Sequence, residues 1–332
     1  MNQTASPSLN SASNLKSTAV TATIYMVAAQ AIFAVVNFAY DAMTNPWNPL
    51  LEGEKLSSSS AVFWQYLIAA IFAVPLVFRI GFGNLKTKHP ILHEVRALAS
   101  AIGAQVFVFG FASGVPVWQM VGLLLTGPFF VLLGSVLFLG EHLSPARVGT
   151  SIVAFCGAFL IVGFGTESFT LASLLPVLAA ALWSTTTLIS KYLSKDETPE
   201  TLTLYLVLLI SVNHAIIGLI LGALVFVLPP DSLPATLTAG FDFAIPSSNA
   251  MGWVLFLGFV TALSQYFLWS AYKRADATYL QPFDDLKLPI NVILAWVLLS
   301  QVPTFWFWPG ATLIVGASLF IAILEHKRPQ VS

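Results

Sequence analysis

Ten apolar segments, most of them close to twenty residues long, follow one another along this chain of 332 residues. A helix needs about twenty apolar residues to cross the roughly 30 Å hydrocarbon core of a bilayer, and it satisfies its backbone hydrogen bonds internally. We therefore expect an all-α integral membrane protein with ten transmembrane helices. The predicted spans are 19–40, 60–79, 97–114, 116–139, 146–165, 171–193, 201–228, 251–272, 276–300 and 305–324.

The amino-acid composition supports this fold class and excludes several others. Hydrophobic residues make up 57% of the chain and charged residues only 9%, whereas a soluble domain carries about 25% charged residues. The net charge of −1 provides no basic surface for nucleic acid. The single cysteine, Cys156, excludes an internal disulfide, and no metal or nucleotide motif occurs, so we expect no cofactor.

The distribution of Lys and Arg predicts how the chain is oriented in the membrane. An even number of spans puts both termini on the same side. If that side is the cytoplasm, every Lys and Arg except Lys55 and Lys287 lies in or beside a cytoplasmic segment, as the positive-inside rule requires. We therefore expect two cytoplasmic tails, a disordered one rich in Ser and Asn at 1–17 and a short basic one at 326–332.

The ninth predicted span, 276–300, carries Asp284, Asp285 and Lys287 deep inside an apolar run. If the helix begins near residue 276, Asp284 lies roughly 12 Å along its axis, near the middle of the membrane. Charges at that depth are costly and usually line a cavity or a transport pathway. Asp284 and Lys287 are three residues apart on one helix face, so the alternative is a structural pair that only neutralises itself.

Two prolines, Pro282 and Pro289, flank these charges. A proline inside a helix removes a backbone donor and kinks the chain, and interrupted helices of this kind form substrate sites in transporters. We expect Lys287 to bind a substrate carboxylate and Asp284 an amine. The cluster has one carboxylate in excess, so Asp284 is also the candidate for proton coupling, with Asp285 paired to Lys287 or facing water.

Polar and aromatic side chains in other predicted spans are candidates to bind substrate in the same cavity. They are Gln30, Asn37, Gln105, Gln119, Trp183, Gln265 and Tyr266. Each of them alone could serve helix packing, but together they indicate a cavity around the ionic cluster that suits a zwitterionic or amphiphilic metabolite.

The two halves of the chain resemble each other weakly, which predicts a first five-helix repeat at 18–165 and a second at 170–325. Three features correspond. They are a proline inside the fourth and ninth spans (Pro128, Pro289), a polar pair at the ends of these spans (Gly140-Glu141, Ser300-Gln301) and a glycine in the span that follows (Gly149, Gly310). Because five spans is an odd number, the repeats must have opposite orientations in the membrane, as in many transporters.

The segment LGEHLSPARVGTSIVAFCGAFLIV resembles the fourth-to-fifth helix signature of the EamA family, in the drug/metabolite transporter superfamily. The segment AYKRADATYLQPFDDLKLPINVILAWVLLSQVP resembles its ninth-helix counterpart. The resemblance covers 19–325 and implies ten helices, inverted repeats and cytoplasmic termini. The chain departs from the family's usual pattern at Gln301, where a Glu is common, at Asp285, often an aromatic residue, and at Gln65, often a basic one.

The sequence thus predicts a secondary active transporter of small organic metabolites, such as amino acids, working by alternating access in the inner membrane of a bacterium. The alternative substrate is a nucleoside- or vitamin-like metabolite, and both import and export fit. A channel is less favoured because no filter loop or repeated pore ring is visible. A membrane enzyme is less favoured because the five histidines are scattered.

Overall fold

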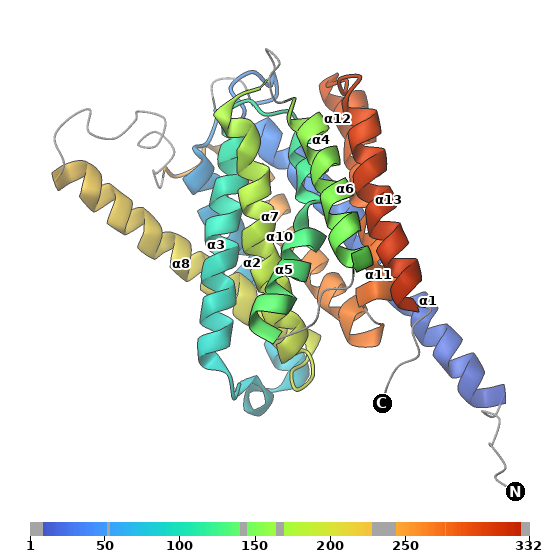
Figure 1. Ribbon diagram of the computed structural model, residues 1–332. Helices are drawn as coiled ribbons and strands as arrows, with labels where there is room; N and C mark the ends of the chain where they lie inside the picture. The colour runs from blue at the N-terminus through green and yellow to red at the C-terminus, as the bar shows by residue number, and fades with distance from the viewer. Residues whose placement is uncertain are drawn as a thin grey trace, which may run out of the picture.

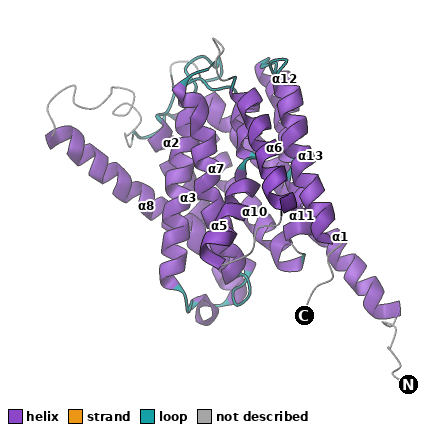
Figure 2. Ribbon diagram, in the orientation of Figure 1, coloured by secondary structure: helices purple, strands orange, loops and turns teal. Residues whose placement is uncertain are grey.

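The computed structural model describes residues 9–51, 54–139, 145–163, 169–227, 244–275 and 277–326, and all regular elements in these ranges are helices (Figure 2). The helices are α1 (Leu9–Thr44), α2 (Ser58–Ile80), η1 (Phe82–Leu85), α3 (Pro90–Ala112), α4 (Val117–Leu124), α5 (Gly127–Leu139), α6 (Pro145–Val162), η2 (Leu171–Leu174), α7 (Leu175–Leu193), α8 (Pro199–Val227), α10 (Ser248–Arg274), α11 (Ala277–Asp284), α12 (Lys287–Leu299) and α13 (Phe307–His326). Figure 1 shows them as an elongated bundle.

Each predicted span overlaps one helix or two consecutive helices. Seven helical segments in the described ranges are long and apolar enough to cross a membrane, and the apolar helices 148–162, 287–299 and 307–320 are shorter. The all-helical membrane fold is therefore confirmed, while the count of ten transmembrane helices and the cytoplasmic location of the termini stay predictions.

Two boundaries differ from those expected. Residues 9–17, assigned from sequence to a disordered tail, are helical and form the first turns of α1. Extending a helix that is already nucleated costs little, because each added residue also adds a hydrogen bond. The third helix begins at Pro90 rather than at 97, which places Arg96 inside α3. Residues 1–8 and 327–332 lie outside the described ranges.

The fourth and ninth predicted spans are each interrupted. The first breaks at 125–126, between α4 and α5, and the second at 285–286, between α11 and α12. Pro128 and Pro289 lie in the first turn of the second helix in each case. A proline is well tolerated there, because the first turn of a helix needs no backbone N–H donor. The prolines therefore mark where each new helix begins.

The helices of the two halves pack in corresponding ways. α1 packs against α10, and α7, which holds the same place in the second half, packs against α3. α1 also contacts α11 and α12, and α7 also contacts α4 and α5. Finally, α2 packs on α8 and α6 on α13, so these helices meet their own counterparts, and the two interrupted spans meet through α4 and α12. A two-fold relation between the halves would produce this pattern.

Helices α6 and α13 approach each other closely at Gly157 and Gly310. A Cβ atom added to Gly157 would lie 2.6 Å from the carbonyl oxygen of Gly310, and one added to Gly310 would lie 2.6 Å from that of Gly157. Only glycine fits at both positions. Small residues are common where membrane helices touch, since they let the two backbones come together.

The two ends of the bundle are named here as they appear in Figure 1. The upper end carries the segments 45–51, 113–116 and 300–306, and the lower end carries 81–89 and 194–198. α1 begins and α13 ends at the lower end. The orientation predicted from Lys and Arg places the lower end in the cytoplasm.

Candidate functional site

A cavity of about 260 Å³ lies inside the bundle, lined by residues beside both helix breaks. Leu124, Gly127 and Pro128 border the first break, and Asp284 and Lys287 border the second. The volume is close to the lower end of the range of about 300–1,000 Å³ for small-molecule sites. The rest of the wall comes from α1, α2, α3, α7, α8 and α10, so both halves of the chain contribute to it.

The ionic cluster at the second break is an ion pair with an added amide. Lys287 Nζ donates to Asp284 Oδ2 at 2.7 Å, and Gln30 Nε2 of α1 donates to Asp284 Oδ1 at 2.8 Å. The side chains of Lys287 and Asp284 are 22% and 17% exposed, so both remain accessible from the cavity. Each carboxylate oxygen of Asp284 thus has a donor, and the two charges offset each other.

Asp285 is the second acid of the cluster, which we expected to pair with Lys287 or to face water. It is buried and does not line the cavity, and its charge attracts Lys287, whose ammonium group donates to Asp284. α11 ends at Asp284, and Asp285 lies in the break before α12. Asp285 is therefore adjacent to the site and outside its wall.

The structure brings six of the ten sequence-predicted site residues into the cavity wall. They are Gln30, Asn37, Trp183, Gln265, Asp284 and Lys287.

Three other predicted residues make contacts outside the cavity wall. Gln105 donates to the Ser58 hydroxyl at 3.0 Å, which ties α3 to the start of α2. Gln119 donates to two carbonyl oxygens at the C-terminal end of α6, at 3.2 Å each. Tyr266 accepts a hydrogen bond from the Arg79 guanidinium at 2.9 Å. These contacts connect helices and leave the three side chains away from the cavity.

Aromatic rings form much of the wall, and the sequence interpretation missed most of them. They are Phe33, Tyr40, Tyr66, Phe107, Trp269 and Tyr272, in addition to Trp183. Helical spacing could have found several. Phe33 and Tyr40 follow Gln30 at intervals of three and ten residues, on the same face of α1, and Trp269 and Tyr272 follow Gln265 at four and seven.

Polar side chains support each helix break. At the second break, Asn291 Nδ2 donates to the carbonyl oxygen of Lys287 at 2.6 Å, and Asn37 Nδ2 of α1 donates to Asn291 Oδ1 at 3.0 Å. At the first break, the Ser184 hydroxyl of α7 lies 2.9 Å from the carbonyl oxygen of Gly127. Both carbonyl groups belong to the first residue of the helix that follows a break. The side chains of Asn37 and Ser184, the first directly on Asn291 and the second directly on Gly127, come from α1 and α7, so the first helix of each half helps to hold its break in place.

Gln65, noted above as a departure from the family pattern, belongs to a hydrogen-bonded chain across the cavity wall. The Tyr40 hydroxyl donates to Gln65 Oε1, and Gln65 Nε2 donates to the Thr261 hydroxyl at 2.6 Å. All three residues line the cavity. The chain connects α1, α2 and α10.

Two polar atoms beside the cavity have no hydrogen-bond partner within the described residues: Gln265 Oε1, an acceptor, and Trp269 Nε1, a donor. They belong to cavity-lining side chains one turn apart on α10. A buried polar atom left unpaired costs about 1–3 kcal/mol. Both atoms are buried, so a bound molecule reaches this donor and acceptor when the surrounding side chains shift.

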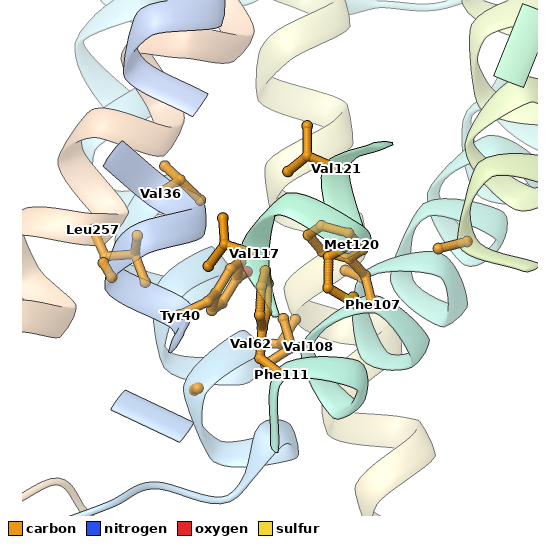
Figure 3. Close-up of a cluster of buried hydrophobic side chains, with 14 of the residues drawn as sticks. Val36, Tyr40, Val62, Phe107, Val108, Phe111, Val117, Met120, Val121 and Leu257 are labelled. Carbon is orange, nitrogen blue, oxygen red and sulfur yellow. The ribbon is translucent and has the colours of Figure 1, made fainter. Parts of the chain in front are cut away.

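An apolar cluster lies between the cavity and the upper end of the bundle. Figure 3 labels ten of its side chains, which come from α1, α2, α3, α4 and α10: Val36, Tyr40, Val62, Phe107, Val108, Phe111, Val117, Met120, Val121 and Leu257. Val36, Tyr40, Phe107 and Val121 also line the cavity. Phe111 and Val117 stand at the upper ends of their helices. This set of ten residues is called the apolar roof below.

Packed helices, two of them interrupted at an internal cavity, are typical of membrane transporters. Residues 20–163 and 170–323 each match the model of the EamA-like transporter family, and the chain belongs to this family. It is a multi-pass protein of the bacterial inner membrane, and the resemblance inferred from its helix motifs is confirmed.

Several named proteins are similar to the chain over almost its full length. A riboflavin transporter of Brucella anthropi is 41% identical over 296 residues, covering 89% of this chain and 96% of the relative. A riboflavin transporter of Rhizobium johnstonii is 38% identical over 312 residues, 94% of each chain. An S-adenosylmethionine uptake transporter of Rickettsia felis is 27% identical over 275 residues, 83% of this chain and 86% of the relative.

A solved crystal structure shares the fold. Its TM-score is 0.60 at 17% sequence identity, and the match covers 92% of this chain and 99% of the other. The comparisons together establish a transporter of small metabolites.

Proposed function

We propose that this protein transports riboflavin, or a flavin of closely similar structure, across the inner membrane by alternating access. Three relatives, 33–41% identical over at least 89% of this chain, are named riboflavin transporters. The vitamin-like alternative from the sequence fits these relatives. The preferred interpretation, a substrate such as an amino acid, gains no support from them.

The observation that carries the proposal is the combination of rings and amides in the cavity wall. A flavin has a flat aromatic ring system whose edge presents carbonyl oxygens, ring nitrogens and an N–H group. Rings such as those of Trp183, Phe107 and Trp269 provide surfaces on which a flat ring can stack. Gln265 Oε1 and Trp269 Nε1 provide an unpaired acceptor and donor for its polar edge.

The ion pair suits the other part of a flavin, a chain of hydroxyl groups. A hydroxyl both donates and accepts, so it can bind the Asp284 carboxylate and the Lys287 ammonium at once. Because the two charges already offset each other, a neutral substrate can bind without leaving a net charge in the cavity. This replaces the earlier assignment of Lys287 to a substrate carboxylate and Asp284 to a substrate amine.

Alternating access in this proposal depends on two inverted repeats, at 18–165 and 170–325. Two observations support that division. The family model matches once in each half of the chain, and the helices of the halves make corresponding contacts. The cavity lies where residues of both halves meet, the place at which inverted-repeat transporters bind substrate.

The test of substrate identity is uptake of labelled riboflavin into proteoliposomes that contain the purified protein. We expect saturable uptake that is inhibited by excess unlabelled riboflavin and not by amino acids. Protein-free vesicles give the background. Uptake of labelled S-adenosylmethionine with no uptake of riboflavin would contradict the proposal and point to the other named group of relatives.

Proton coupling through Asp284 is the second part of the proposal. The prediction is that Asp284→Asn abolishes uptake driven by a proton gradient while riboflavin exchange across the membrane partly persists, because the amide cannot carry a proton. Flux is measured from about pH 5.5 to 8.5, a range that brackets the titration of perturbed carboxylates. Asp285→Asn, next to the cavity wall but outside it, is the matched control. Equal and pH-insensitive flux in wild type and Asp284→Asn would exclude coupling at this residue.

A further inference from the structure

A carboxylate at the upper end of the bundle is completely buried. Asp41 lies in the last turn of α1 and has 0% exposure. Asn45 Nδ2 donates to its Oδ1 at 2.8 Å, and Asn48 Nδ2 donates to its Oδ2 at 2.6 Å. A third amide, Gln301 Nε2, approaches Oδ2 at 3.4 Å. Three side-chain amides thus converge on one carboxylate.

Each of these amides is oriented by a backbone N–H group at its other end. The side-chain oxygens (Oδ1) of Asn45 and Asn48 accept from backbone N–H groups two residues further along the chain, at 3.0 and 2.9 Å. The side-chain oxygen (Oε1) of Gln301 accepts from the backbone N–H of Val117, the first residue of α4, at 2.8 Å. An amide has one acceptor end and one donor end, so all three nitrogens must point toward Asp41.

Gln301 is the member of this group that joins separate parts of the chain. Asn45 and Asn48 follow Asp41 in sequence and move with it. Gln301 instead follows α12, where Ser300 adopts a left-handed conformation (φ 55°, ψ 22°) and the Gln301 N–H caps the carbonyl of Ala295. Its side chain therefore connects the end of α12 to the ends of α1 and α4.

The same two helix ends carry the apolar roof. Tyr40 precedes Asp41 in α1, and Val117 both binds Gln301 and packs in the roof (Figure 3). Whatever holds these helix ends together also keeps the roof closed over the cavity. The contact between Gln301 and Asp41 is the longest of the three at 3.4 Å. It can break while Asn45 and Asn48 still satisfy the carboxylate.

We propose that Asp41 and Gln301 are positioning residues that hold the cavity closed at the upper end, and that their separation opens it to that side during transport. The inference rests on the chain being a transporter and not on riboflavin as its substrate.

The test exchanges donor and acceptor across the contact. Gln301→Glu still accepts from the Val117 N–H but places a second carboxylate against Asp41, where repulsion replaces a hydrogen bond. The double variant Asp41→Asn/Gln301→Glu removes the repulsion between carboxylates and lets the new amide at position 41 donate to the new carboxylate at position 301, while the hydrogen bond from Asn48 to the same atom is lost. We expect the single variant to open the upper end and the double variant to close it again.

Opening is measured by labelling a cysteine in the cavity wall. The exposed native Cys156 is replaced by Ser, and Ala104, which lines the cavity, is replaced by Cys. A membrane-impermeant thiol reagent is then added to each side of oriented vesicles in turn. Loss of the hydrogen bond and repulsion between the two carboxylates both favour separation, so labelling from the upper side should rise about tenfold or more in Gln301→Glu. It should return toward the wild-type rate in the double variant.

A second glutamine in α4 provides the matched control. Gln119 donates to carbonyl groups of α6 and does not contact Asp41, so Gln119→Glu should lower thermal stability without changing the side from which the cysteine reacts. If Gln301→Glu does not reach the membrane, Asp41→Asn replaces it, and the same rise is expected. Unchanged labelling from the upper side, or a double variant that labels like the single one, would overturn the proposal.

Discussion

At the scale of single residues, two cavity-lining side chains of α10 carry a buried acceptor and a buried donor that have no partner among the described residues, Gln265 Oε1 and Trp269 Nε1. Trp269 has a second contact, since the guanidinium of the fully buried Arg96 lies 5.8 Å from its ring centroid. A cation near an aromatic ring is an attractive contact that helps to hold the ring in place. The indole is thus positioned from α3 while its N–H stays available.

This arrangement predicts the effect of removing the indole N–H alone. Trp269→Phe keeps an aromatic surface and loses the donor, and a neutral hydrogen bond contributes about 0.5–1.5 kcal/mol. We expect the Kd for riboflavin to rise roughly two- to twelvefold, measured by quenching of flavin fluorescence in detergent. Trp296→Phe, at a residue 61% exposed on the outside of α12, is the control. An unchanged Kd in Trp269→Phe would exclude the indole N–H from recognition.

Glutamine shows which part of the site a sequence can predict. Asp284 and Lys287 could be identified because a charge in an apolar run is conspicuous and costly. Gln30, Gln105 and Gln119 are alike in sequence, yet only Gln30 reaches the cavity. A buried amide binds whichever group tertiary packing brings near it, so its role cannot be predicted from its own helix.

At the scale of helices, the two breaks were partly predictable. Pro289 indicated an interruption of the ninth span, and the matching Pro128 pointed to the fourth. Neither proline indicated which side chains would bind the backbone beside each break. Those come from other helices, Asn37 through Asn291 at one break and Ser184 at the other, and such contacts between distant segments have no local sequence signal.

The contact of α6 with α13 gives a prediction at this scale. Gly310→Ala places a Cβ 2.6 Å from the carbonyl oxygen of Gly157, so the helices must separate. Overpacking of this kind costs about 1–3 kcal/mol. We expect a lower unfolding temperature in detergent. Gly316→Ala in the same helix meets nothing within 4 Å and should be neutral or slightly stabilising, because Ala favours helix over Gly. Equal effects of the two variants would disprove the close contact.

At the scale of the whole molecule, the orientation in the membrane is the prediction to test. Reporter fusions after Lys88, Lys195 and Lys273 should be active only as cytoplasmic reporters, and a fusion within 231–248 only as an external one. The reason is the concentration of Lys and Arg on one side of the predicted spans. One well-expressed fusion with the opposite location would contradict the orientation.

The close approach of Gly157 and Gly310 has a practical use. With no side chain between the two backbones there, the pair has nothing to repack when other helices shift. α6 and α13 should then move as one rigid unit in every state of the transporter. Spin labels attached to these two helices, away from the two glycines, should keep a constant distance from each other. Changes in the distances to α1 or α7 can be compared with that constant distance as the protein cycles.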